Sequence, residues 1–446
     1  MSKRRRRRQR IPQDIIEANI ESLSAEGRGV ARVEGKTVFV DNALVGETVK
    51  FQYTKTSSKF DEARAIEILS TSADRVEPAC EHYGICGGCS LMHMKPAAQI
   101  QHKQQTLLDL FKYQANVSPE EILAPLTGPV FAYRFKARLG VKYVAKKEKV
   151  LVGFREKNAP YIANLNSCKV LHESVGEKLL ELGDLIIGME ARQTIPQIEV
   201  SVSDAGTALT VRHLKPLSDS DKNAWIEFAK QYDMQIYLQS GGPQTVEILW
   251  PESPQPLFYH LPQEDIRIEF QPLDFTQVNP VINEQMLAQA LAFLELNKDE
   301  KVLDLFCGLG NFTLPIARLA KQVVGVEGVE VMVAKARENA HLNGIENAQF
   351  FAADLSADLA SMPWLMNQQY DKILLDPPRS GAMEMLKYLG RLNAKRIVYV
   401  SCHPSTLARD AQVLVQEYGY TLSKAGVMDM FPHTGHVESM AVFDKA

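Results

Sequence analysis

The sequence predicts an α/β fold of the Rossmann-like, doubly wound type for its second half, with a small β-barrel at the front and a β-rich α+β domain between them. Three observations support this prediction. From about residue 274 onward, short apolar runs alternate with helical patterns, as in parallel sheets covered by helices. Residues 12–70 contain short strand patterns separated by glycines, which is typical of a small closed barrel. The stretch 131–273 is also rich in strand patterns.

The composition is that of an ordinary globular protein. The chain has 446 residues, 45% of them apolar and 23% charged. No long apolar run is present, and none follows the basic N-terminus, so we expect neither a membrane span nor a secretory signal. Six cysteines in a chain of this length do not form a dense disulfide scaffold. Metal-binding or catalytic thiols in a reducing cytoplasm fit them better.

A basic arm begins the chain. Residues 3–10, KRRRRRQR, hold seven basic side chains, although the net charge of the whole chain is −4. A segment with so much like charge cannot pack, so we expect residues 1–11 to be disordered. Two interpretations remain open, an arm that binds RNA phosphates with release of counterions and a solvated tail without a dedicated role.

The front of the chain is expected to form a barrel over residues 12–70. The predicted strands are Ile15–Leu23, Gly29–Val33, Thr37–Val40, Thr48–Tyr53 and Ala63–Leu69. Barrels of this size often bind single-stranded nucleic acid, although the fold alone does not establish that role. The segments 25–40 and 45–51 resemble a TRAM domain, an RNA-binding barrel found on RNA-modifying enzymes.

Four cysteines have the pattern of a metal centre. Cys80, Cys86 and Cys89 are spaced C-x5-C-x2-C among several glycines, and Cys168 follows far downstream. Four thiolates can ligate a [4Fe–4S] cluster, and tetrahedral zinc is the alternative. Zinc sites usually pair their ligands two and two, so the spacing of three plus one favours iron–sulfur. We expect these cysteines to lie in a central iron–sulfur and RNA-binding domain made of residues 71–98 and 131–273.

The central domain is interrupted by a predicted helix and begins with a basic segment. Residues 96–112 have helical periodicity, and we place residues 99–130 with the catalytic domain. Residues 134–157 hold nine basic and two acidic side chains. Aromatic side chains are interleaved with them, which suits phosphates and unstacked bases of a folded RNA, and a charged hairpin face is the alternative.

The second half, residues 274–446, predicts alternating strands and helices. The strands are Val302–Phe306, Val323–Glu327, Gln349–Ala353, Lys372–Leu375 and Ile397–Val400, with a closing antiparallel pair at Gly426–Met430 and Glu438–Phe443. The helices are Phe312–Ala320, Val329–Leu342, Met383–Leu389 and Thr406–Glu417. Ligands of such sheets bind at the carboxyl ends of the strands.

Those strand ends predict a nucleoside cofactor. The first strand runs into Asp304-Leu-Phe-Cys-Gly-Leu-Gly-Asn, whose glycines allow close approach of a cofactor. Glu327 ends the second strand, where an acid can accept ribose hydroxyls, and Asp354 follows the third, where it can accept an adenine amine. The loop is neither GxGxxG nor a Walker loop, so S-adenosylmethionine fits better than a dinucleotide.

A thiol follows the fifth strand. Cys402, in the sequence SCHP, stands just past an apolar run, and Asp376-Pro-Pro-Arg379 follows the fourth strand in the same way. A cysteine beside a cofactor loop suggests covalent help in a group transfer, whereas a buried structural cysteine is the alternative. Asp376 can accept a hydrogen bond from cofactor or substrate, or it can serve only to form a turn.

Five motifs resemble the RNA uracil-5 methyltransferase family. They are FxQxN (275–279), DLFCGLGNFT (304–313), LLDPPR (374–379), SCHP (401–404) and FPHTGHVE (431–438). The cysteine pattern and the TRAM-like front narrow the resemblance to the members that methylate one uracil of 23S ribosomal RNA. The resemblance implies a monomeric enzyme that uses S-adenosylmethionine and a [4Fe–4S] cluster.

The resemblance also implies roles for individual residues. Cys402 is the expected nucleophile and Glu438 the expected base, because methylation at C5 needs a thiolate at C6 and removal of the C5 proton. The cofactor contacts that it implies are Gln277, Phe306, Asn311, Glu327, Asp354 and Asp376. His403 departs from the family pattern, in which Asn commonly follows the catalytic cysteine.

Three other functions remain open at this point. A transfer-RNA uracil methyltransferase shares several motifs but usually lacks the barrel and the cluster. An exocyclic amino methyltransferase needs no thiol, so Cys402 and Arg379 speak against it. An RNA-binding iron–sulfur protein with an inactive catalytic half is the non-enzymatic alternative.

Overall fold

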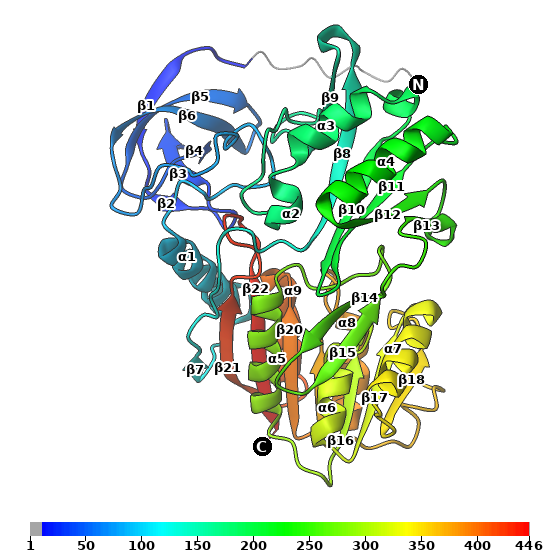
Figure 1. Cartoon of the computed structure of the whole chain (residues 1–446). Helices are drawn as coiled ribbons and strands as arrows, with labels where there is room; N and C mark the ends of the chain where they lie inside the picture. The colour runs from blue at the N-terminus through cyan, green and yellow to red at the C-terminus, as the bar shows by residue number, and fades with distance from the viewer. Residues whose placement is uncertain (1–10, 446) are drawn as a thin grey trace, which may run out of the picture. The chain divides into compact units, whose positions relative to one another are not determined.

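The computed structural model describes residues 11–445, so the predicted basic arm at residues 1–10 lies outside the described part. The chain divides into two compact units. One contains the described residues up to Lys103 together with Pro432–His436, and the other contains Gln104–Phe431 and the C-terminal segment from Val437 onward. Figure 1 shows the course of the chain through both. The four-part domain division drawn from the sequence stays a prediction.

The first unit contains a six-stranded barrel. Its strands are β1 (Ile15–Asn19), β2 (Ser22–Leu23), β3 (Gly29–Val33), β4 (Lys36–Asp41), β5 (Thr48–Lys55) and β6 (Phe60–Ser70), in the order β1-β5-β6-β4-β3-β2. The edge strands β1 and β2 are nearly contiguous in the chain, so the sheet must curl to bring its edges together. A single strand from Ile15 to Leu23 was predicted, and this is wrong. The chain turns at Ile20, whose N–H donates to the Glu47 carbonyl at 2.9 Å.

The segment that holds three of the predicted cluster cysteines follows the barrel. Its turn at Gly84 has φ +82°, a backbone conformation that favours glycine. The helix α1 (Pro96–Asp109) begins after it. Residues 432–436 return to this unit, where the N–H groups of Ser90 and Leu91 both donate to the His433 carbonyl at 2.8 and 2.9 Å. The cysteine loop is therefore fixed by a segment more than 300 residues away in the chain.

The second unit contains a six-stranded central sheet. Its strands are β8 (Lys136–Val144), β9 (Lys149–Gly153), β10 (Gln197–Ser203), β11 (Gly206–Arg212), β12 (Met234–Gln239) and β13 (Val246–Trp250), in the order β13-β12-β11-β10-β8-β9. The short α2 (Glu173–Gly176) precedes α3 (Leu179–Ile187), which packs on β9, and α4 (Asp219–Tyr232) packs on β12 (Figure 1). Trp225 of α4 is completely buried, so this sheet has a hydrophobic core.

The Rossmann-like sheet forms the rest of the second unit. Its strands are β16 (Lys301–Leu305), β17 (Gln322–Glu327), β18 (Ala348–Ala352), β19 (Lys372–Leu375), β20 (Arg396–Ser401), β21 (Tyr420–Met428), β22 (Glu438–Lys445) and the short β7 (Glu121–Ile122). The order is β18-β17-β16-β19-β20-β22-β21-β7, parallel from β18 to β20, with β22 antiparallel to β20. The predicted doubly wound sheet and its closing antiparallel pair are confirmed.

Helices and a hairpin surround this sheet. The helices are α5 (Pro280–Leu294), α6 (Thr313–Leu319), α7 (Glu330–Leu342), α8 (Met383–Leu392) and α9 (Pro404–Gln416). The hairpin of β14 (Leu257–Leu261) and β15 (Ile266–Phe270) packs against α7. A π-helical turn, Leu110–Ala115, packs against α9, and β7 pairs with β21. Residues 110–122 thus lie with the Rossmann-like sheet although they precede the central sheet in the chain.

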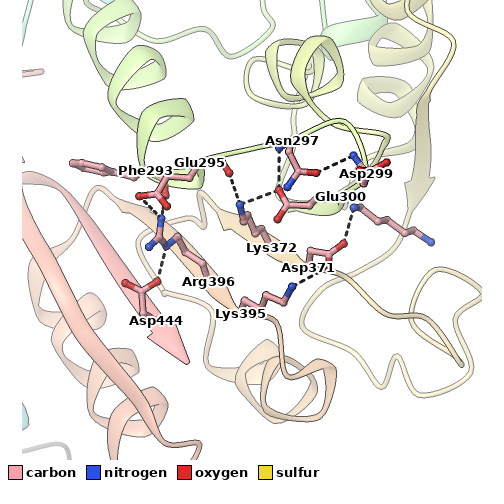
Figure 2. A network of polar contacts seen from close by, with 11 residues as sticks. Phe293, Glu295, Asn297, Asp299, Glu300, Asp371, Lys372, Lys395, Arg396 and Asp444 are labelled. Carbon is pink, nitrogen blue, oxygen red and sulfur yellow. Dashed lines mark hydrogen bonds and ion pairs between the residues drawn. The ribbon is translucent and has the colours of Figure 1, made fainter. Parts of the chain in front are cut away.

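Ion pairs fix the amino-terminal edge of the Rossmann-like sheet (Figure 2). Arg396, which begins β20, donates to the Phe293 carbonyl at 2.7 Å and to the Asp444 carboxylate at 2.5 Å. Lys372, which begins β19, pairs with Glu300 at 2.9 Å. These contacts tie β19 and β20 to the end of α5, so the opposite edge is the one left for a ligand. None of the helices described combines the length and apolar character that a membrane crossing needs.

Candidate active site

The loop after β16 forms the centre of the site. Phe306 has φ +66°, and such a conformation costs a non-glycine residue about 1–2 kcal/mol. Hydrogen bonds from the N–H groups of Phe306 and Cys307 to the Val326 carbonyl, at 2.8 and 3.1 Å, hold the backbone there. Gly308 follows in the positive-φ region and donates its N–H to the Glu327 carboxylate at 3.2 Å. The loop and the end of β17 are therefore one rigid structure.

The neighbouring strand ends carry two of the predicted cofactor residues. Glu327 ends β17, and its backbone carbonyl accepts the Ala353 N–H at 2.9 Å. Asp354 comes directly after Ala353 and is exposed, with hydrogen bonds from Ser356 that lower the pKa of its carboxyl. The structure therefore brings Phe306, Glu327 and Asp354 to adjacent points of one sheet edge.

A buried carboxyl lies beneath this edge. Asp304 is completely buried and accepts the Thr313 hydroxyl at 2.5 Å through Oδ2. Within the described part of the chain its Oδ1 has no hydrogen-bond partner. Burial, together with the negative charges of Asp376 and Glu327, raises the pKa of Asp304 to about 8. At neutral pH this carboxyl is mostly protonated, so it can donate a hydrogen bond.

Asn311 is held by residues that sequence reasoning missed. Its Oδ1 accepts the Tyr259 hydroxyl at 2.9 Å and the Asn283 amide at 3.2 Å. Its own amide donates to Asn283 Oδ1 at 3.0 Å. An amide has two N–H groups, so one remains for a ligand. Neither Tyr259 nor Asn283 lies in a recognisable motif, and no local signal marked them.

The FxQxN segment, which contains Gln277, is clamped on two sides. Lys136 and Ser201 of the central sheet donate to the Pro272 carbonyl at 2.5 and 2.7 Å. On the other side, Lys335 of α7 pairs with both oxygens of Asp274 at 2.6 Å. Gln277 itself is partly buried between these anchors and α5. Burial lowers the pKa of Lys136 to about 8, because it disfavours the charged ammonium.

Strand register brings Cys402 and Glu438 together. In the antiparallel pair of β20 and β22, Ser401 is the partner of Ser439. Cys402 is one residue beyond Ser401 and Glu438 one residue before Ser439, so the register places them opposite one another. Both side chains are partly buried. The two residues expected to act as nucleophile and base are therefore neighbours, although 35 positions separate them in the sequence.

The environment of Cys402 keeps its thiol protonated. Burial and the negative charges of Glu438 and Asp376 together raise the pKa of Cys402 to about 11, although the positive charge of Arg379 acts in the opposite direction. Burial also raises the pKa of Asp376 to about 7, so this carboxyl is only partly ionised near neutrality.

The donor set of this edge fits S-adenosylmethionine. The ribose hydroxyls and the ammonium of that molecule are donors, and the edge presents the carboxylates of Glu327 and Asp376 as acceptors. The partnerless Oδ1 of Asp304 is a further polar atom below them. When bound, this cofactor supplies an electrophilic methyl group.

The predicted cluster cysteines are on two units. Cys80, Cys86 and Cys89 lie in the loop before α1, and Cys168 lies between β9 and α2 in the second unit. All four are partly buried, and the Gly88 N–H points at Cys86 Sγ, 3.4 Å away. Thiolates with backbone N–H···S contacts are a donor set that iron–sulfur clusters accept. Among residues 11–445, no group of three or more His, Cys, Asp or Glu side chains is arranged to hold a metal ion.

The basic segment differs in part from the expectation. Lys142, Lys146, Lys147 and Arg155 are exposed around β8 and β9, as a phosphate-binding face requires. Tyr133, however, is only 3% exposed and cannot stack on a base. The prediction that all the interleaved aromatics face RNA is therefore wrong for Tyr133, because its ring belongs to the core.

Comparisons with known proteins agree with this fold and this site. A family model described as tRNA (Uracil-5-)-methyltransferase matches residues 259–446, and a TRAM domain model matches residues 11–66. The structure of the Pyrococcus abyssi tRNA (uracil-54, C5)-methyltransferase, in complex with S-adenosyl-L-homocysteine, superposes with a TM-score of 0.73. It is 22% identical and covers 96% of this chain and 100% of that one. The class of protein is thus a Rossmann-like methyltransferase with an appended barrel.

Closer relatives give the family within that class. A 23S rRNA (uracil(1939)-C(5))-methyltransferase RlmD of Alcanivorax borkumensis is 52% identical over 441 residues, 99% of each chain. Another, from Hahella chejuensis, is 52% identical over 447 residues, 99% of this chain and 100% of the relative. The chain belongs to this family, the 23S rRNA (uracil(1939)-C(5))-methyltransferases of the RlmD type.

Proposed function

We propose that this protein transfers a methyl group from S-adenosylmethionine to C5 of one uracil of 23S ribosomal RNA, the uracil that its relatives' name numbers 1939. The observation that carries the proposal is the register that places Cys402 opposite Glu438 at the ligand edge of the sheet. A thiol and a carboxylate are the two groups that methylation at C5 requires. An exocyclic amino methyltransferase would need no thiol.

The reaction follows from these two side chains. The Cys402 thiolate forms a bond to C6 of the uracil, and the electrons of the C5–C6 double bond move toward the C4 carbonyl as an enolate. C5 would then take the methyl group that the bound cofactor supplies, with S-adenosylhomocysteine as the other product. Glu438 accepts the C5 proton, the C5–C6 double bond forms again, and the thiolate is expelled. The uracil must leave its stack to reach Cys402, which is least costly in a loop or single strand.

We propose the same cofactor contacts that the sequence motifs suggested. Glu327 would accept the ribose hydroxyls, Asp354 the adenine amine, and Asp376 the amino group or the uracil. Phe306, Asn311 and Gln277 would line the same site. Their support is that the loops holding Phe306, Asn311, Glu327, Asp354 and Asp376 are joined by hydrogen bonds at one edge.

The catalytic pair is tested with RNA that contains 5-fluorouracil. Fluorine cannot leave as a cation, so the wild type should stop at a covalent adduct that survives denaturing electrophoresis. Cys402→Ala should form no adduct and no 5-methyluridine. Glu438→Gln should form an adduct even on ordinary uracil RNA, with turnover reduced at least about 100-fold, the effect expected for loss of a general base. Full product from Cys402→Ala would refute the mechanism.

RNA would be bound by the barrel and by the basic face of β8 and β9. The exposed Lys142, Lys146, Lys147 and Arg155 suit phosphates, and Tyr161, which is 69% exposed, offers a ring for an unstacked base. We expect a monomer acting on RNA in the cytoplasm. The division into a barrel (12–70), a central domain (71–98 and 131–273) and a catalytic domain (99–130 and 274–446) belongs to the same proposal.

We also propose that Cys80, Cys86, Cys89 and Cys168 hold a [4Fe–4S] cluster. The support is their spacing and the N–H···S contact at Cys86. Such a cluster would order loops that bind RNA rather than take part in the methyl transfer. Anaerobically purified protein should contain about four iron and four sulfide ions per chain, and Cys89→Ser should lose them. One zinc ion per chain without sulfide would establish the alternative.

A further inference from the structure

The helix that follows the nucleophile also holds the loop on which Arg379 lies. α9 begins at Pro404, two residues after Cys402. From its first turn, the Thr406 hydroxyl donates to the Arg379 carbonyl at 3.2 Å. One turn later, Arg409 Nη2 donates to the Ser380 carbonyl at 2.9 Å. Cys402 and the backbone around Arg379 are therefore fixed to the same helix.

A buried carboxylate organises these contacts. Asp410 of α9 is completely buried. Its Oδ2 accepts the Ala382 N–H at 2.8 Å and the Tyr399 hydroxyl at 2.7 Å. Its Oδ1 accepts two N–H groups of Arg409, at 2.8 and 2.7 Å. Four donors from three parts of the chain thus meet one carboxylate, an arrangement in which a buried charge is fully compensated.

The loop of residues 379–382 packs tightly against the Asp410 carboxylate. Gly381 has φ +78°, which a side chain would disfavour. A Cβ on Gly381 would lie 2.7 Å from both Arg409 Nη2 and Asp410 Oδ2. The backbone of this loop is consequently held at three residues. Thr406 contacts Arg379, Arg409 contacts Ser380, and Asp410 contacts Ala382. An exposed loop with this sequence would otherwise be free to move.

The position of Arg379 affects the reactivity of Cys402, because the positive charge of Arg379 favours the thiolate form. The neighbours of Cys402 are the carboxylates of Glu438 and Asp376, which oppose ionisation, and the guanidinium of Arg379, which supports it. Arg379 is itself exposed, so the surrounding protein restricts its side chain little. The position of its backbone therefore limits how close the guanidinium can come to the sulfur.

We propose that Asp410 is a positioning residue, which, with Arg409 and Thr406, keeps Arg379 beside Cys402 and thereby makes the sulfur reactive. The inference rests on the proposed function, in which Cys402 attacks the uracil. It assigns to α9 a second role besides covering the sheet, namely to join the SCHP and DPPR motifs into one unit. Asp410 touches neither substrate nor cofactor in this scheme.

The test measures the sulfur directly, without RNA or cofactor. The rate of alkylation of Cys402 by iodoacetamide is followed from pH 6.5 to 10 by mass spectrometry of its peptide. Asp410→Asn should lower this rate about threefold at each pH below the inflection, which corresponds to an upward shift of about half a pH unit. Removal of a nearby negative charge would by itself raise the rate, so the sign separates positioning from a direct electrostatic effect.

Matched variants control for general damage. Asp221 is also buried, and it also accepts backbone N–H groups, from Glu190 and Ala191 at 3.0 Å, but it lies in the region of the central sheet. Asp221→Asn should leave the alkylation profile of Cys402 unchanged. If Asp410→Asn does not fold, Thr406→Val removes one hydroxyl from the same clamp and should lower the rate about twofold. In an Arg379→Gln background, Asp410→Asn should have no further effect, because its target is gone.

The outcomes are distinct. An unchanged or increased alkylation rate in folded Asp410→Asn would overturn the inference, and so would additive effects of Asp410→Asn and Arg379→Gln. Failure of the wild type to make 5-methyluridine in ribosomal RNA would overturn the proposed function instead. The alkylation result does not depend on that activity, so the two failures can be told apart.

Discussion

At the scale of single residues, the site contains a thiol whose surroundings disfavour the charged form that the proposed reaction needs. Burial and two carboxylates raise the pKa of Cys402 to about 11, with Arg379 as the opposing charge. The resting enzyme therefore keeps its sulfur protonated, which protects it from oxidation and from unwanted alkylation. The Glu438 carboxylate is therefore expected to have two effects. It helps to keep Cys402 protonated, and it is the expected base.

The raised pKa predicts how the rate depends on pH. The reactive form of Cys402 is the deprotonated one, so its fraction grows about tenfold per pH unit below the pKa. We expect log kcat/KM at saturating cofactor to rise with pH by about one per unit between pH 7.5 and 9. Below pH 7 the slope should increase if Asp376, with a pKa of about 7, must also be ionised. A flat profile over this range would contradict the prediction.

The short motifs are enough to propose roles for Cys402 and Glu438, because their neighbours in the sequence form a pattern. The residues that support them carry no such pattern. Asp410 lies in an amphipathic helix, where an acid usually faces solvent, and Asn283 lies in another helix. Both turn out to be buried and hydrogen-bonded to partners distant in the chain. Sequence reasoning missed them because burial of a polar side chain depends on what packs against it.

At the scale of elements, the barrel depends on one buried ion pair. Glu47, in the turn that leads into β5, is completely buried. Arg75 contacts both of its oxygens, at 2.6 and 2.7 Å, and the N–H groups of Leu44 and Ser72 donate to the same carboxylate. The pair thus ties the barrel to the segment that leaves it. Burial alone would raise the pKa of Glu47, but Arg75 and the two N–H groups lower it overall.

Arg75→Met should destabilise the barrel by about 3 kcal/mol, because it leaves a buried carboxylate without its counterion. The measurement is hydrogen exchange of the Leu44 and Ser72 amides, which reports local opening. Since the pKa of Glu47 is lowered in the folded state, its stabilising effect is present above the unfolded value and is lost as the pH falls through the folded value. Protection in the wild type should accordingly decrease below about pH 4.5.

An exposed ion pair provides the control for this prediction. Arg32 and Glu21 lie 4.0 Å apart with more than half of each side chain exposed. Arg32→Met should change the same amide protection by less than about 1 kcal/mol, as surface pairs do. The double variant Glu47→Gln with Arg75→Met should recover part of the lost stability, since it removes the unpaired charge. Equal effects of Arg75→Met and Arg32→Met would show that burial of the pair is unimportant.

At the scale of the whole molecule, segments far apart in the sequence build each part. Residues 432–436 belong to the first unit, whereas β22 directly after them completes the Rossmann-like sheet. β7, which precedes the central sheet in the chain, also pairs with the Rossmann-like sheet. A chain that crosses between units in this way should fold its parts cooperatively. The predicted order of the strands in the second half was confirmed, but the sequence analysis missed helix α5 (Pro280–Leu294) and began the penultimate strand six residues too late, at Gly426 and not at Tyr420.

The basic arm gives a prediction for the full chain. Residues 3–10 carry seven basic side chains, and each phosphate contact contributes about 0.7 to the salt dependence of single-stranded RNA binding. Deleting residues 2–10 should therefore reduce the slope of log affinity against log salt by up to about 5. A variant of equal length with neutral serines and glycines should behave like the deletion. An unchanged slope in both variants would favour the alternative of a solvated tail without a role.

Local patterns in the chain were sufficient to predict the doubly wound sheet and the barrel, and to propose a nucleophile and a ligand-binding edge. These features depend on periodicity, on glycine and proline at turns, and on short motifs, all of which are contiguous in the chain. The folded arrangement was needed to show that Cys402 lies opposite Glu438 and near Arg379, that Asp410 is buried, and that the thiol is protonated at rest. Those properties come from register and packing between distant segments, and such contacts leave no pattern in the neighbouring residues.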